Sequence, residues 1–315
     1  MIYLPFALSL VFVGLSGLVC RRTSPRPAAW SVTAAMMLLA FSTVGAVALL
    51  AWPLAARLPL VAHVGGWRPG AVNQGVPVPE WLSVFAVLAL AVITVLVVRY
   101  LRSVGDGLIE IARMHADLGP TGAEAVAVVH DPRPSAHALP RTIRHRGVVV
   151  VSTGLLDALD AEEWAAVVAH EHAHLAHAHR LFLIVAGLAA AMNPLVSLGR
   201  HDLAFVLERW ADEDAAVRTS RMVTARALAK AALAKLSIVN ERIAAGSARS
   251  ATRVMVMELG SLGVPQRVAA LLHPETDRRR TGLAWFVAGL ALVAVAAIAW
   301  ATRDTEHAFE LLRAH

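Results

Sequence analysis

The sequence contains very little cysteine, lysine or tyrosine, and little charge of either sign. Its single cysteine, Cys20, excludes a disulfide framework, a zinc finger and a thioredoxin-type pair. Lys230 and Lys235 are the only lysines, and no basic stripe interleaved with aromatic residues predicts DNA or RNA binding. Only 17% of the residues are charged while 57% are hydrophobic, which excludes a disordered tail, a coiled coil and an ordinary cytosolic enzyme. The chain is therefore predicted to be a membrane protein that carries a soluble part.

Four apolar stretches are long enough to cross a bilayer, and none of them contains a charged side chain. They are residues 1–20, 30–52, 81–98 and 283–301. A helix needs about 20 apolar residues to cross a hydrocarbon core about 30 Å thick. We therefore expect about four transmembrane helices, the first of which is retained rather than cleaved as a signal peptide.

Arginine clusters flank these stretches and predict their orientation. The clusters are Arg21, Arg22 and Arg26; Arg99 and Arg102; and Arg278, Arg279 and Arg280. All of them fall on one side if the amino terminus is outside, and positive charge marks the cytoplasmic side. We expect a multi-pass cell-membrane protein with three spans in residues 1–100, a cytoplasmic domain over 101–281, and a fourth span with a short external tail over 282–315.

The cytoplasmic part is long enough to have its own core. Residues 121–130 and 146–152 read as short strands with a turn at 131–135 between them, so a small β-sheet is expected. Most of the remainder has a helical pattern, notably residues 160–180, 203–218 and 222–243.

One predicted helix carries the motif HExxH. Asp160 and Glu163 form a capping box at its start. His170 and His174 are four residues apart, about 40° around the helix axis, so both imidazoles can meet one cation. Glu171 is rotated by about 100° from His170, which places its carboxylate beside the cation as a candidate base.

Two histidines do not complete a catalytic zinc site, which usually has three protein ligands. Arg180 stands where the third histidine of the motif HExxHxxGxxH would fall, and this excludes that subclass. Glu208, in the downstream pattern ExxAD, is the expected third ligand, and Asp212 is expected to fix the tautomer of a ligand histidine. We predict one Zn²⁺ per chain, although other first-row metals suit the same ligands.

The other histidines near the motif are expected outside the ligand set. His177 lies one turn further on the metal face, and His172 and His179 are expected on the opposite face. A second group usually stabilises the oxyanion in such chemistry. Its identity stays open among His145, His201, Arg218 and His273.

The apolar stretch 181–198 is also long enough to span a membrane. A full crossing would place Glu208 on the opposite side from His170, and no three-ligand site could form. We therefore expect this stretch to re-enter and return, or to pack as a buried helix broken near Pro194.

Several motifs together resemble a known family over roughly residues 100–220. They are VVVVSTGLL, the helix DxEEWxxVxAHExAHLxxxH, Asn193-Pro194 and ExxAD. The chain resembles the integral-membrane zinc peptidases of the BlaR/MecR type and, more distantly, the HtpX and CAAX-processing proteases. The resemblance implies a mainly α membrane protein with a gluzincin-like cytoplasmic domain, in which His170, His174 and Glu208 bind zinc and Glu171 is the base. Residues 131–140 resemble the segment that precedes the edge strand in those enzymes.

The antibiotic receptors of this type continue into an external penicillin-binding domain, whereas this sequence stops at His315. Neither lysine has a serine three residues before it, so direct β-lactam sensing by acylation is not expected.

We expect a membrane-embedded zinc endopeptidase. The resemblance implies regulated proteolysis, in which the enzyme cleaves a cytoplasmic transcriptional repressor or itself, and the alternative is an HtpX-like quality-control protease. A metal transporter is disfavoured because the spans lack ionisable residues, and a catalytically silent receptor is disfavoured because the site residues are intact.

The substrate backbone is expected to pair with the sheet edge at Val148, Val149, Val150 and Val151. The expected partners are this peptide or protein substrate and the lipid bilayer, without direct nucleic acid, and homo-oligomerisation stays open.

Overall fold

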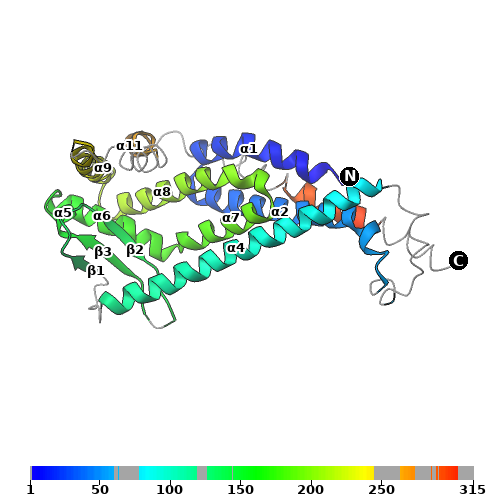
Figure 1. Cartoon of the computed structure of the whole chain (residues 1–315). Helices are drawn as coiled ribbons and strands as arrows, with labels where there is room; N and C mark the ends of the chain where they lie inside the picture. Colours follow the sequence, from blue (N-terminus) through cyan, green and yellow to red (C-terminus); the bar gives the residue numbers. More distant parts are fainter. Residues whose placement is uncertain are drawn as a thin grey trace.

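The computed structural model describes residues 2–59, 63, 78–118, 126–143, 145–244, 263–273, 285, 289 and 291–303. Within these residues the fold is mainly helical and contains one three-stranded sheet. The long helices lie side by side in an elongated bundle, and the sheet, α6, α9 and α11 gather at one end of it (Figure 1). The expected mainly α architecture with a small β-sheet is confirmed.

Three described helices are long and apolar enough to cross a membrane: α1 (Leu4–Arg22), α2 (Pro25–Ala55) and α4 (Glu80–Leu118). α2 and α4 include the expected spans 30–52 and 81–98, and α1 includes residues 4–20 of the first expected span. A fourth span arises in the described part of the chain only if α6 and α7, which are bent by 53° relative to each other, count as one.

The expected fourth span at residues 283–301 lies partly outside the described residues. Its described part contains an apolar helix, Ala291–Arg303, which is shorter than a span. Most of the segment between the second and third expected spans, and the tail after residue 303, also lie outside the described residues. The orientation of the chain therefore stays a prediction.

Helix α4 continues well beyond Val98, where its apolar stretch ends. No proline interrupts residues 99–118, so the helix runs on with polar residues on its exposed side. Near its end Ile111 packs against Leu139, Val148 and Val150 of the sheet. One unbroken helix thus joins the bundle to the sheet (Figure 1).

The sheet consists of β1 (Val126–Val129), β2 (Ala136–Leu139) and β3 (Val148–Ser152), in the order β1-β3-β2. β3 pairs in parallel with β1 and antiparallel with β2, and all five of its residues are buried. The prediction that Val148–Val151 form a sheet edge is therefore wrong. A continuous run of β-branched residues is typical of a strand covered on both faces, whereas the edge strand β2 lies inside the segment 131–140. Residues 121–125 of the first predicted strand lie outside the described residues.

After the short helix α5 (Thr153–Leu156), helix α6 (Ala161–Ala176) begins at the predicted capping box. The backbone N–H of Glu163 donates to Asp160 Oδ1 at 2.9 Å, and the N–H of Asp160 donates to Glu163 Oε2 at 3.0 Å. The helix ends earlier than the expected residue 180, because Ala178 adopts the left-handed conformation with φ 50°. The chain bends there into α7 (His179–Met192).

The chain reverses direction at Asn193, as the break predicted near Pro194 requires. A short 3-10 helix, η2 (Pro194–Leu198), follows α7, and α8 (Gly199–Arg218) then runs back beside it (Figure 1). The buried Asn193 amide donates to Ser9 Oγ at 2.9 Å and to Thr43 Oγ1 at 3.0 Å. These bonds attach the turn to α1 and α2.

Two further helices, α9 (Arg221–Ala244) and α11 (Val264–Leu272), cover the end of the molecule that holds α6. The fully buried carboxylate of Glu163 accepts hydrogen bonds from Arg226 Nε and Lys230 Nζ, each at 2.7 Å. These charged bonds attach α9 to the first turn of α6.

Candidate metal centre

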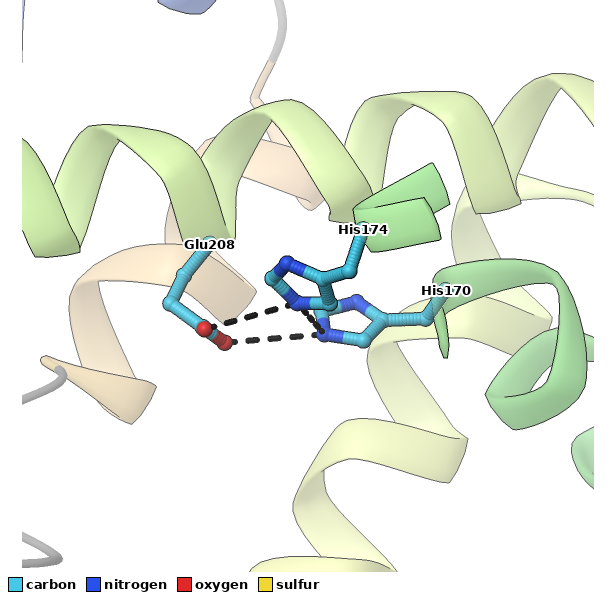
Figure 2. A group of neighbouring side chains, drawn as sticks. All are labelled: His170, His174 and Glu208. Carbon is cyan, nitrogen blue, oxygen red and sulfur yellow. Dashed lines mark hydrogen bonds and ion pairs between the residues drawn. The ribbon is translucent and has the colours of Figure 1, made fainter. Parts of the chain in front are cut away.

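His170 and His174 project from successive turns of α6 toward Glu208 on α8 (Figure 2). Their Nε2 atoms lie 3.2 Å apart. Glu208 Oε2 lies 3.5 Å from His170 Nε2, and Glu208 Oε1 lies 3.5 Å from His174 Nε2. The chain reversal at Asn193 thus returns Glu208 to the two histidines, as the sequence predicted.

These separations fit a small divalent cation. Two ligand atoms bound at about 2.1 Å in tetrahedral geometry lie about 3.4 Å apart, close to the distances of 3.2 and 3.5 Å found here. Two imidazole nitrogens and one carboxylate are also a common ligand set for catalytic zinc. Within the described residues, this is the only group of three or more His, Cys, Asp or Glu side chains whose ligand atoms lie within 4.8 Å of one another.

Small and apolar residues let α8 approach α6 closely. Ala166, Ala169 and Ala173 are buried on α6, and Ala211 and Ala215 are buried on α8, which packs against α6. Because alanine leaves the helix backbones near each other, the short Glu208 side chain can reach the imidazoles.

Asp212 lies one turn after Glu208 and contacts the far side of the first histidine. His170 Nδ1 lies 3.0 Å from Asp212 Oδ1. A proton held on Nδ1 by this carboxylate leaves the Nε2 lone pair of His170 directed at the candidate metal position. The geometry is the one predicted for Asp212.

Arg267 on α11 is the site residue that the sequence reasoning missed. Its guanidinium donates to Asp212 Oδ2 from Nε at 2.7 Å and to Oδ1 from Nη2 at 2.6 Å, and Nη1 lies 3.0 Å from Glu208 Oε2. Both Arg267 and Asp212 are almost completely buried. No motif marks this arginine, which lies 55 residues beyond Asp212, so only its place in the fold reveals it.

The charges of the site shift its pKa values in opposite directions. Burial alone would lower the pKa of His170, but hydrogen bonds to Asp212 and Glu208 raise it. Burial and the neighbouring charge of His170 lower the pKa of His174 to about 4. Burial would raise the pKa of Glu208, but His170 and Arg267 hold it below its ordinary range. A cation that binds here therefore competes with the proton on His170.

Glu171 follows His170 directly on α6. Burial lowers the pKa of Arg267, whereas the charges of Asp212, Glu208 and Glu171 all raise it. The Glu171 carboxylate is thus close enough to the centre to act on its charges. Its role as base stays a prediction.

The neighbouring histidines differ in part from expectation. His177 Nε2 lies 2.5 Å from Asp214 Oδ2 and its ring stacks on Trp210, so His177 lies outside the ligand group. The expectation that His179 lies on the opposite face is wrong, because its Nδ1 is 2.8 Å from His174 Nδ1. The bend at Ala178 turns His179 back toward α6.

Of the candidates for oxyanion stabilisation, His145 stacks on the ring of His115, which bonds to the Pro140 carbonyl beside the sheet. The identity of the stabilising group stays open.

Comparison with known protein families places the site in context. The model of peptidase family M48 matches residues 96–279, which is more than half of the chain. The chain belongs to peptidase family M48. Three of its described helices are also long and apolar enough to cross a membrane.

Similar proteins carry the name HtpX. The chain is 34% identical over 104 residues to a "Protease HtpX homolog" of Thermodesulfovibrio yellowstonii, covering 30% of this chain and 36% of the relative. It is 40% identical over 74 residues to a "Protease HtpX homolog" of Acidiphilium cryptum, a match that covers 23% of this chain and 25% of the relative. It is 34% identical over 87 residues to a "Protease HtpX" of Idiomarina loihiensis, a match that covers 28% of this chain and 29% of the relative.

The matched segments thus span little more than a third of each relative at most. No solved structure matches the chain. The M48 match and the HtpX names support the HtpX-like resemblance, which the sequence motifs indicated as the more distant one. The resemblance to the BlaR/MecR type stays a prediction.

Proposed function

We propose that the protein is a zinc-dependent endopeptidase in which His170, His174 and Glu208 hold the metal. The observation that carries this proposal is the triangle of ligand atoms, with sides of 3.2, 3.5 and 3.5 Å. The M48 membership supports the reaction class, and the two imidazoles and one carboxylate support zinc.

When bound, zinc supplies a Lewis acid that polarises a peptide carbonyl and lowers the pKa of water to about 7. Glu171 is the general base, which takes a proton from the attacking water and delivers it to the departing amine. Asp212 and Arg267 hold His170 and Glu208 in place, through contacts of 3.0 Å each.

The order of the strands moves the proposed substrate-binding edge of the sheet from β3 to β2. β3 already pairs on both sides, so its backbone is not available to a substrate. We place the substrate at the outer edge of β2, Ala136–Leu139, because this strand packs against α6 and pairs with β3 through its other edge alone. Pairing through the backbone would align a peptide carbonyl without demanding one particular sequence.

The biological role has two candidates. The HtpX names of the relatives favour quality control of membrane proteins. Regulated cleavage of a cytoplasmic repressor, or of the enzyme itself, is the alternative. For either role, the arginine clusters, which include the arginines that end α1, favour a peptidase domain in the cytoplasm and an amino terminus outside.

The test uses the full chain, purified in detergent and loaded with zinc. The wild type should cleave a fluorescently labelled unfolded protein, and a chelator should stop the cleavage. Glu171→Gln should keep the zinc but lose the cleavage. Cleavage retained by Glu171→Gln would overturn the assignment of the base, and a wild type that binds no zinc would overturn the metal site.

A further inference from the structure

His179 contacts a candidate metal ligand from the side away from the metal position. His174 directs Nε2 toward Glu208 Oε1 at 3.5 Å, and its other ring nitrogen, Nδ1, lies 2.8 Å from Nδ1 of His179. The two rings meet edge to face, with centroids 4.8 Å apart. The contact is the counterpart, on the second histidine, of the one that Asp212 makes to the first.

The chemistry of imidazole fixes the direction of this hydrogen bond. A neutral ring has one N–H donor and one lone pair. If His174 presents its Nε2 lone pair to a cation, its proton must lie on Nδ1 and is donated to His179. His179 then accepts on Nδ1 and carries its own proton on Nε2.

The surroundings of His179 agree with this arrangement. Its Nε2 is buried and has no hydrogen-bond partner within the described residues. The ring lies against Trp210, with centroids 4.9 Å apart, and near Phe182 at 6.4 Å. Aromatic faces can receive an N–H weakly, but a phenylalanine or leucine would fill the same space without burying an unpaired donor. Packing alone therefore gives no reason for a histidine here.

The backbone also departs from regular geometry to bring this ring into place. In a continuous helix, residues five positions apart point about 140° away from each other. Ala178, with φ 50°, breaks α6 and turns the start of α7 by 53°, so that His179 faces His174. A left-handed conformation is unfavourable for alanine, and such strain clusters at functional sites.

We propose that His179 is a positioning residue for the metal centre, which accepts the Nδ1 proton of His174 and so directs Nε2 at the cation. The proposal rests on the proposed metal site. Its essential feature is an acceptor atom at the place of His179 Nδ1, and this feature separates it from a role in packing.

The experiment measures zinc affinity of the full chain in detergent, by competition with a chromophoric chelator, and the visible absorption of the Co²⁺-loaded protein. His179→Phe keeps the aromatic bulk and removes the acceptor, so zinc affinity should fall by about 10- to 100-fold and the Co²⁺ spectrum should change. His179→Asn keeps an acceptor near the Nδ1 position and should restore most of the affinity. His177→Phe is the matched control, because His177 belongs to the same aromatic cluster and does not contact His174.

Three results would overturn the proposal while leaving the metal site intact. They are wild-type affinity in His179→Phe, equal losses in His179→Phe and His179→Asn, and an equal loss in His177→Phe. Denaturant unfolding of each variant, measured in the presence of a chelator, shows whether the metal-free protein keeps its fold. A wild type without zinc affinity would instead overturn the proposed function, and this proposal with it.

Discussion

Arg267 of α11 and Asp212 of α8 form a two-point ion pair, with contacts of 2.6 and 2.7 Å, although the two residues are 55 positions apart in the sequence. Both side chains are almost fully buried. Arg267 also contacts Glu208, so one guanidinium neutralises two acidic groups beside the candidate metal position. The metal centre therefore depends on α11 as well as on α6 and α8.

Replacement of Arg267 by methionine should lower the free energy of unfolding by about 3–5 kcal/mol, because it removes the guanidinium that contacts the Asp212 and Glu208 carboxylates and leaves the buried Asp212 with His170 as its remaining partner in the described site. Arg267→Lys should recover only part of this loss, since an ammonium group cannot make the two-point contact. Denaturant unfolding in detergent measures the free energy of unfolding of both variants. In the double variant Arg267→Met/Asp212→Asn the two effects should not add, and full additivity would contradict the pairing.

Zinc should stabilise the folded wild type. At a free zinc concentration 100 times the dissociation constant, the expected gain is about 2.7 kcal/mol, seen as a higher unfolding temperature. His174→Ala and Glu208→Ala should remove this gain, whereas Asp214→Ala, which alters a neighbouring residue outside the ligand group, should keep it. An equal zinc effect in wild type and Glu208→Ala would place the ion elsewhere.

The buried carboxylate of Glu163 should make stability depend on pH. Burial alone would raise its pKa, but hydrogen bonds from Lys230, the Asp160 backbone and Arg226 lower it below the ordinary 4.5. The ionised Glu163 therefore stabilises the fold fully above pH 4.5. This stabilisation is lost as the pH falls through the lower pKa that Glu163 has in the folded protein. Glu163→Gln should cost about 2 kcal/mol at pH 7 and flatten the acid branch of the stability curve. An unchanged acid branch in the variant would show that other groups cause it.

The turn at Asn193 should be sensitive to loss of its side chain. Asn193→Ala removes the bonds to Ser9 and Thr43 and the bond that Asn193 Oδ1 accepts from the Leu195 N–H at 3.1 Å. The expected loss in the free energy of unfolding is about 1–3 kcal/mol, with weaker zinc binding because α8 returns Glu208 from this turn. Ser197→Ala, on the exposed side of the same turn, should leave both unchanged. Identical behaviour of the two variants would argue against this role for Asn193.

Local sequence patterns predicted most of the side chains that the structure brings together in the candidate metal centre. The spacing of His170 and His174 requires only one helical turn, and the pattern ExxAD supplied Glu208 and Asp212. The capping box likewise depends on residues three positions apart. Such features are visible because the interacting groups are close in the sequence or lie in a short motif.

The remaining features depend on tertiary structure. Arg267 reaches the site from a separate helix, and the approach of His179 depends on the left-handed conformation of an alanine, which no residue preference signals. The place of β3 in the sheet depends on which strands pair with it, although its unbroken run of valines already favoured a central position.

The unbroken length of α4 sets how far the sheet stands from the apolar stretch of that helix. Ile111, which packs under the sheet, lies 13 residues beyond the apolar stretch that ends at Val98, or about 20 Å along a helix that rises about 1.5 Å per residue. Arg209, the residue after Glu208, instead donates to the carbonyl oxygen of Cys20 at 2.8 Å, where the first apolar stretch ends. Under the proposed function, a peptide bond close to the boundary of that apolar stretch would therefore be within reach of the candidate metal centre, while the sheet held the chain further along α4.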